Sequence, residues 1–272
     1  MPIHTWFLTE FLMIRSLLAT RYLTPLREGG SLPAIVEADD DELYVMKFAG
    51  AGQGPKALIA ELVAGEIGRA LGLPVPEIVL MTLDTQFGRT EADPEIRALL
   101  QASVGLNLGI RYLPKAFAFS PLLRPPPDPG LASAIVWFDA YVTNVDRTPR
   151  NTNILLWQGA LWLIDHGAAI YFHHMAAGPE GFQAYSENPF PLIKDHVLLP
   201  RARALAEADI VLRERLTLEI IDRIVATIPD AWLTGAGQTA SPAEYRIAYS
   251  DYLWRRLQAS DLFLQEAIRA QH

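Results

Sequence analysis

The sequence contains no cysteine among its 272 residues. Disulfide bonds, thiolate nucleophiles and cysteine metal sites are therefore excluded, and this composition fits a protein of the reducing cytoplasm. The sequence also has no G-x-S-x-G elbow and no H-E-x-x-H helix, so a serine hydrolase of the elbow type and a zinc protease lack their starting motifs.

An excess of positive charge is also missing, because the formal net charge is −8. We therefore expect no direct nucleic-acid partner and no attraction to an anionic membrane. No window reaches the roughly eighteen unbroken apolar residues that a membrane span requires. The apolar N-terminal stretch, residues 1–23, is interrupted by Glu10 and Arg15 and has no basic region before it. We expect this stretch to form a helix that packs on a soluble, cytoplasmic protein.

The order of periodic segments predicts an α+β protein with two lobes. Short β-like runs fill residues 19–83, apart from one helical window at 55–72 that starts at a proline and stops at a glycine. From residue 131 onward helical patterns dominate, apart from two apolar runs that predict a hairpin around Gln158 and Gly159. We expect a small β-rich lobe with one helix over 1–110 and a larger, mainly helical lobe over 111–272.

A polar segment, "DRTPRN" at residues 146–151, separates the apolar helix predicted over 131–142 from the predicted hairpin. The hairpin ends in "DHG", with Asp165 directly after an apolar run. A carboxylate at the end of a core strand is costly unless a cation or metal pairs with it. Two carboxylates and an amide at the mouth of a hairpin can converge, and Mg²⁺ prefers such oxygen ligands together with phosphates and water. Asx residues also favour turns and caps, so a purely structural role for this segment remains an alternative.

The spacing D-x-x-x-x-N, then a hairpin, then D-x-G is the layout of the catalytic loop and metal-binding motif of protein kinases. That layout requires a glycine-bearing loop, a strand lysine and a helical glutamate further upstream. The sequence provides them in this order as "REGGS" at 27–31, Lys47 in "LYVMKF" and the glutamates of "AELVAGEIGRALG".

At this point the chain resembles a HipA-like kinase. "TNVDRTPRN" is similar to the catalytic loop of that family, "VMKF" to its strand lysine, and "AELVAGEIGRALGLPVPE" to the helix that follows. The resemblance implies a bilobal protein-kinase-like fold. It also implies ATP- and Mg²⁺-dependent phosphorylation, typically of protein serine or threonine and including autophosphorylation.

The resemblance also implies roles for individual residues. Asp146 would be the catalytic base that orients the attacking hydroxyl, and Arg150 could neutralise charge on the transferring phosphoryl group. Asn151 and Asp165 would hold Mg²⁺.

Nucleotide contacts would come from the N-terminal part of the chain. Lys47 would contact the α- and β-phosphates and pair with Glu61. Gly29 and Gly30 would form the phosphate loop. Ser31 would face the phosphates or accept a phosphoryl group, although a plain turn serine is the simpler interpretation.

The glutamate that pairs with Lys47 has two candidates. The apolar arc of the helical wheel contains Glu66 and leaves Glu61 outside, and an acid on a buried stripe needs a cation. The motif spacing to Leu71-Gly72 favours Glu61 instead. A helix packed on more than one side would weaken the wheel argument, and we choose Glu61.

Two positions depart from the family pattern. His166 replaces the aromatic residue of the common D-F-G motif, and Thr148 stands where the HipA pattern often has a histidine. The family's toxin members have further N-terminal structure for which this chain has little room, so we do not expect an antitoxin partner. Two other functions stay open: a small-molecule phosphotransferase on the same fold, and a nucleotide-binding pseudokinase that serves as a scaffold.

Overall fold

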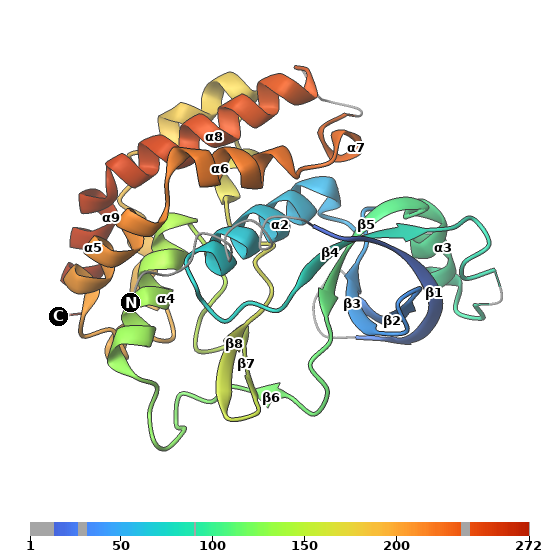
Figure 1. The fold of residues 1–272 in the computed structure, drawn as a ribbon, viewed down its shortest axis with the longest axis horizontal. Helices are drawn as coiled ribbons and strands as arrows, with labels where there is room; N and C mark the ends of the chain where they lie inside the picture. The colour runs from blue at the N-terminus through green and yellow to red at the C-terminus, as the bar shows by residue number, and fades with distance from the viewer. Residues whose placement is uncertain (1–13, 27–31, 90, 235–239, 272) are drawn as a thin grey trace.

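A computed structural model of the chain describes residues 14–26, 32–89, 91–234 and 240–271 (Figure 1). Five strands close into a barrel in the order β1-β2-β3-β5-β4. Neighbouring strands run antiparallel except for β1 and β4, which are parallel. The strands are β1 (Ser16–Pro25), β2 (Ala34–Ala38), β3 (Leu43–Lys47), β4 (Ile78–Leu83) and β5 (Gly105–Arg111).

The N-terminal stretch differs from our prediction. Residues from Ser16 onward form strand β1 and not a helix, and β1 closes the barrel through Ser16–Leu18 against Leu80–Thr82. The helical pattern of this stretch was misleading because pairing with β2 and β4 satisfies its backbone groups within the barrel. The rest of the predicted helix, residues 1–13, lies outside the described residues.

Strand β3 directs its side chains to two different environments. Tyr44 and Met46 are fully buried in the barrel, while Leu43, Val45 and Lys47 are only partly buried. Successive side chains of a strand point to opposite faces, so Lys47 points away from the barrel core that holds Tyr44 and Met46. The strand lysine is thereby directed toward the helical part of the molecule.

Helix α2 (Gly54–Ala70) joins the barrel to that helical part (Figure 1). All residues from Leu58 to Gly68 are buried, because the helix contacts β4 and β5 on one side and α6 and α7 on others. Gly65 permits the contact with β4, since a Cβ there would lie 2.3 Å from the Cδ1 of Ile78. The helix is therefore enclosed, and so are both of its glutamates.

A second helix, α3 (Pro94–Ala102), lies beside the barrel and was not predicted. Asp93 caps it by accepting hydrogen bonds from the backbone N–H groups of Glu95 and Ile96. The Asp-Pro-Glu segment is thus a helix start, with proline in the first turn. The described residues before 111 consequently contain two helices, α2 and α3, where we expected one.

The predicted hairpin is confirmed as strands β7 (Ile154–Trp157) and β8 (Ala160–Leu163). Gln158 and Gly159, with φ of +49° and +79°, form its two-residue turn. Strand β6 (Phe117–Ala118) pairs with β7 and completes a three-stranded sheet. The hairpin follows helix α4 (Pro129–Tyr141) and carries Asp165 just beyond β8.

The remaining helices form the larger part of the molecule (Figure 1). Two 3-10 segments, η1 (Tyr171–His174) and η2 (Pro179–Tyr185), come after Asp165, and a large apolar cluster joins the helices to α2. The other elements are η3 (Pro191–Asp195), η4 (Leu199–Arg201), α5 (Leu205–Arg215), α6 (Leu218–Ala226), α7 (Asp230–Leu233), α8 (Pro242–Gln258) and α9 (Ser260–Arg269).

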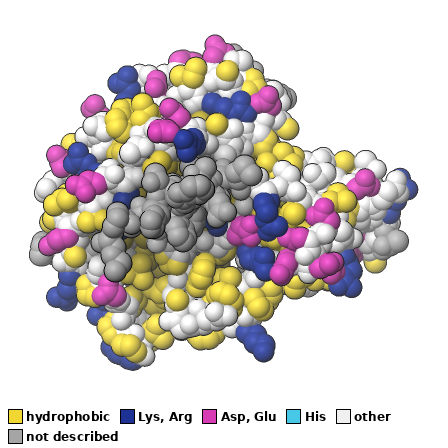
Figure 2. All heavy atoms as spheres, in the orientation of Figure 1, with side chains coloured by type: hydrophobic (Ala, Val, Ile, Leu, Met, Phe, Trp, Pro, Cys, Tyr) yellow, Lys and Arg dark blue, Asp and Glu magenta, His cyan; other side chains and the backbone are white. Residues whose placement is uncertain are grey.

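On the face shown in Figure 2, acidic and basic side chains are interspersed over the barrel. Some opposite charges form ion pairs, and Arg15 pairs with both Asp40 and Glu77. Within the described ranges, every helix is too short or too polar to cross a lipid bilayer.

Candidate active site

Lys47 is the centre of the candidate site. Its ammonium group donates a hydrogen bond of 2.5 Å to Glu61 of α2 and one of 2.6 Å to Asp165 after β8. Glu61 is fully buried, whereas the Asp165 side chain is half exposed. Three segments that lie far apart in the sequence therefore meet at one cation.

The charges of Lys47 and Glu61 hold each other in the ionised state. Burial alone would lower the pKa of Lys47, but the Glu61 and Asp165 carboxylates raise it above its ordinary value. Burial alone would raise the pKa of Glu61, but Lys47 and His166 hold it well below its ordinary range. The ion pair thus offsets a desolvation penalty that either group alone would bear.

Asp165 occupies a strained backbone position, with φ of +55°, in the left-handed region that non-glycine residues seldom adopt. His166, the next residue, turns inward instead of outward. Its ring is buried, lies edge-on to Phe138, and places Nδ1 3.5 Å from the Glu61 carboxylate. The strained residue thus turns the Asp165 carboxylate toward Lys47 while its neighbour packs against the core.

Asp146 lies in the loop between α4 and β7 and is bound by two amides. The side-chain amides of Asn151 and Asn153 both donate to its Oδ2, at 2.7 and 3.3 Å. Burial raises the pKa of Asp146 and the negative charge of Asp165 adds to this effect, while the two amide hydrogen bonds oppose it. Asn153, just beyond the predicted catalytic segment, is therefore also a partner of Asp146.

A cavity of about 170 Å³ brings Lys47, Asp146, Asn151 and Asp165 together. The loop from Phe48 to Gly54 and the first turn of α2 form its opposite wall. Buried Asn107 of β5 secures that loop by accepting a hydrogen bond of 2.8 Å from the backbone N–H of Ala49. Residues from the barrel, from α2 and from both ends of the predicted catalytic segment thus face one cavity.

The oxygen atoms at this cavity suit a divalent cation that is shared with a phosphate ligand. Asp165 uses Oδ1 for Lys47 and Asn151 uses its NH₂ group for Asp146, which leaves one oxygen on each side chain. Within the described residues, no cluster of three or more His, Asp or Glu side chains forms a metal cage. This donor set fits Mg²⁺, which usually takes one or two protein ligands and completes its shell with phosphate and water.

Other residues that the sequence suggested lie differently. Arg150 is exposed, does not line the cavity, and makes no hydrogen bond or ion pair with the part of the chain that the structure describes. Gly29, Gly30 and Ser31 lie outside the described residues.

A buried network that the sequence analysis missed holds the loop of Asp146. Asp139 of α4 is fully buried and accepts hydrogen bonds from Arg147 Nε at 2.6 Å, His196 Nε2 at 2.9 Å and Asn144 Nδ2 at 2.9 Å. Burial alone would raise the pKa of Asp139, but Arg147 and His196 hold it well below its ordinary range. The signal was present in the sequence, since an aspartate inside an apolar helix needs a cation.

Arg147 extends this network to the hairpin. The same guanidinium donates to the backbone carbonyls of Asn153, before β7, and of Ile164, directly before Asp165. It follows Asp146 in the chain and is itself buried. One side chain therefore fixes the spacing between the segment that carries Asp146 and the segment that carries Asp165.

The other buried glutamate of α2 has a different partner. Glu66 lies 3.1 Å from Arg69 on the same helix, and not beside Lys47. Burial raises its pKa to about 7, although Arg69 opposes the rise. Glu61 is therefore the glutamate that contacts the strand lysine, as the motif spacing indicated and the helical wheel did not.

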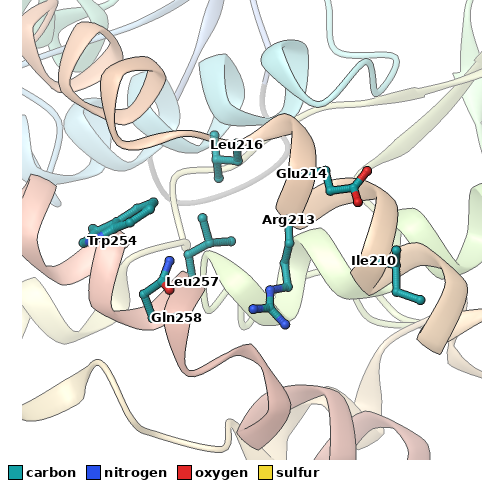
Figure 3. A pocket seen from close by; sticks show the side chains of 7 residues that line it. All are labelled: Ile210, Arg213, Glu214, Leu216, Trp254, Leu257 and Gln258. Atoms are coloured by element: carbon teal, nitrogen blue, oxygen red, sulfur yellow. The ribbon is translucent and has the colours of Figure 1, made fainter.

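A separate surface hollow, of about 360 Å³, lies between α5 and α8 (Figure 3). Trp254, Leu257 and Leu216 form much of its lining, and Arg213 and Glu214 flank them on α5. Glu214 is the single carboxylate among its lining residues, and the hollow shares no residue with the first cavity.

Comparison with solved structures identifies the class of fold. The crystal structure of the proinflammatory kinase CtkA of Helicobacter pylori superposes with a TM-score of 0.59 over 94% of this chain and 99% of CtkA, at 13% identity. A Golgi casein kinase with Mn and ADP bound gives a TM-score of 0.49 at 11% identity, covering 97% of this chain and 77% of that protein. The first likeness shows a kinase-like fold, and the second is too low to support an argument.

The family follows from the sequence itself. A family model described as HipA-like kinase matches residues 20–265, and the chain belongs to this family. The resemblance inferred from the motifs is thus confirmed. No curated protein matches the chain.

The environment of Glu66 predicts a specific pH dependence of stability. Burial raises the pKa of the Glu66 carboxyl to about 7. Its contribution to stability is therefore fully present at pH values below the pKa of the unfolded chain, and it is lost as the pH rises through the folded pKa. The free energy of unfolding of wild type minus that of Glu66→Gln should therefore fall by about 2 kcal/mol between pH 5 and pH 8. Urea unfolding of both proteins at the two pH values measures this, and a constant difference would contradict it.

Proposed function

We propose that the protein transfers the γ-phosphoryl group of ATP to a hydroxyl group, in a reaction that depends on Mg²⁺. The observation that carries the proposal is the cavity where Lys47, Asp146, Asn151 and Asp165 meet, in a chain of the HipA-like kinase family. We also propose that the acceptor is a serine or threonine hydroxyl of a protein, including this protein itself. In this proposal the barrel with α2 acts as one lobe and the helical part as the other.

Each residue has a distinct role in this reaction. Lys47 binds phosphate oxygens of the nucleotide through its ammonium group, and Glu61 keeps that group in place through the 2.5 Å hydrogen bond. Asp146 orients the acceptor hydroxyl and takes its proton as the new P–O bond forms and the bond to the leaving ADP breaks. The raised pKa of Asp146 favours this proton transfer.

Asn151 and Asp165 are the residues that would hold the Mg²⁺ ion, each through the side-chain oxygen that accepts no hydrogen bond from the described residues. Bound there, the ion would neutralise negative charge on the phosphates. Asn151 also restrains Asp146 at 2.7 Å, so it links the residue that orients the hydroxyl to the metal site.

Removal of either carboxylate should suppress phosphoryl transfer. We expect Asp146→Asn to lower the rate roughly 10³-fold through loss of the base, and Asp165→Asn to leave no Mg²⁺-dependent transfer, because it removes a ligand of the ion. The measurement is incorporation of label from ATP radiolabelled at the γ-phosphate, with and without Mg²⁺, followed by mapping of the labelled residue.

Asp195 is an exposed aspartate that does not line the cavity. It provides a matched control, since Asp195→Asn should keep full activity. Wild-type activity in folded Asp146→Asn and Asp165→Asn proteins would refute the assignment. Turnover of ATP on an added small acceptor, with no label on protein, would point to a small-molecule phosphotransferase instead.

Lys47 and Glu61 should behave as a coupled pair. Lys47→Met leaves Glu61 buried without its cation and should destabilise the protein by about 3 kcal/mol. Adding Glu61→Gln should recover most of that stability, but not the activity, since the phosphate contact is still lost. Thermal unfolding and steady-state kinetics of the two single variants and the double variant test this, and recovery of activity in the double variant would be incompatible with the role of Lys47.

Arg147 should position the reacting groups without contacting the nucleotide. Arg147→Lys keeps a cation beside Asp139 but cannot reach both backbone carbonyls of the hairpin. We expect kcat to fall about 10²-fold, as for a small misplacement of catalytic groups, with little change in the KM for ATP. Arg213→Lys, an exposed arginine on α5, is the control, and a wild-type kcat in Arg147→Lys would exclude the positioning role.

A further inference from the structure

A second cavity, of about 270 Å³, lies on another side of α2 from the first. Its walls are the first two turns of α2, the segment η1–η2 and helix α8. It shares no lining residue with the cavity that holds Lys47, although α2 contributes to both. The residues that define its chemistry are Lys56, His173, Phe182, Tyr245 and Tyr249.

Hydrogen-bond donors at this second cavity are only partly used. Lys56 Nζ donates one hydrogen bond of 2.5 Å, to the backbone carbonyl of His173, and an ammonium group has three protons. The ring of His173 is fully buried, with Nδ1 3.0 Å from the Tyr249 hydroxyl. Its Nε2 has no hydrogen-bond partner within the described residues. A buried polar atom without a partner is unfavourable, and a hydrogen bond with a ligand or water would offset this cost.

The groups around this cavity are basic, and no acid compensates them. Within the parts of the chain that the structure describes, no carboxylate pairs with Lys56, although the protein has 31 acidic and only 23 basic residues. Burial lowers the pKa of Lys56, and burial followed by the proximity of Lys56 lowers the pKa of His174. Burial, followed by the proximity of His174 and Lys56, also lowers the pKa of His173. Negative charge brought to this place would favour the protonated forms of all three groups.

The remaining lining is apolar and aromatic. Phe182, Tyr245 and Tyr249 are buried, and their rings lie against one another with centroids 4.9 Å apart for Phe182 and Tyr249 and 6.3 Å apart for Phe182 and Tyr245. Such a wall accepts the flat or apolar body of a ligand. The volume lies slightly below the ~300 Å³ at which pockets for drug-sized ligands begin, so the ligand must be small.

We propose that this cavity is a second binding site, for a small ligand whose anionic head group, a phosphate or a carboxylate, lies beside Lys56 and whose apolar body packs on the Phe182–Tyr245–Tyr249 wall. The site is separate from the proposed catalytic cavity. Its existence does not depend on the proposed phosphoryl transfer.

Phenyl phosphate is a suitable probe, with benzoate to compare a carboxylate head and phenol as the neutral analogue. Binding is measured by calorimetry on the full chain with ADP and Mg²⁺ at saturating concentration, so that the probe cannot report the catalytic cavity. We expect an anionic probe to bind at least tenfold more tightly than phenol. The preference between phenyl phosphate and benzoate identifies the head group.

Two lysine variants complete the test. Lys56→Met keeps the length of the side chain but removes the charge, and should weaken probe binding at least tenfold while thermal unfolding shows an intact fold. Lys194→Met removes an exposed cation on η3 and should leave binding unchanged. Equal affinity in Lys56→Met, displacement of the probe by ADP, or no binding at millimolar concentration would each overturn the proposal. Binding that depends on Lys56 in a protein without kinase activity would overturn the proposed function and leave this site standing.

Discussion

The hydrogen bonds of the Lys47 ammonium group are the interaction on which the rest of the structure depends. Its two carboxylate partners lie 14 and 118 residues away in the sequence, on α2 and after β8. Burying charged groups carries a desolvation penalty, and only close contact between the opposite charges offsets it. The ammonium group and its carboxylate partners must therefore be kept in place. The barrel, α2 and the hairpin must therefore keep fixed relative positions, and the full burial of α2 from Leu58 to Gly68 provides this constraint.

A second buried cluster has a related purpose on the other side of the cavity. Asp139 and Arg147 connect α4 to the loop of Asp146 and to both ends of the hairpin. The first cluster sets where Asp165 lies relative to Lys47, and the second sets where Asp165 lies relative to Asp146. Together the two clusters set the distances between Lys47, Asp146 and Asp165, the three charged groups that face the cavity.

The sequence predicted the elements whose signals are local. The hairpin, α2 and α4 follow from turn residues, a proline start and apolar runs, and the motif order led to the family. It did not predict α3, a helix of nine residues, or β1, whose parallel partner β4 lies far along the chain. The helical wheel favoured Glu66 because it assumes one buried face, and α2 is buried on all sides. The Asp139 network joins residues up to 57 positions apart, which periodicity cannot reveal.

Burial separates the carboxylates of the site into two kinds. Glu61 and Asp139 are fully buried beside cations that hold their pKa values well below the ordinary range, so they stay ionised and serve as anchors. Asp146 is only partly buried, and its pKa is shifted upward, because amides and not cations are its direct partners and Asp165 lies near. A carboxylate in that environment binds a proton more readily than an anchoring one. The difference in partners, cations for the anchors and amides for Asp146, is therefore what makes one acid of this cluster suited to accept a proton while the others hold the structure around it.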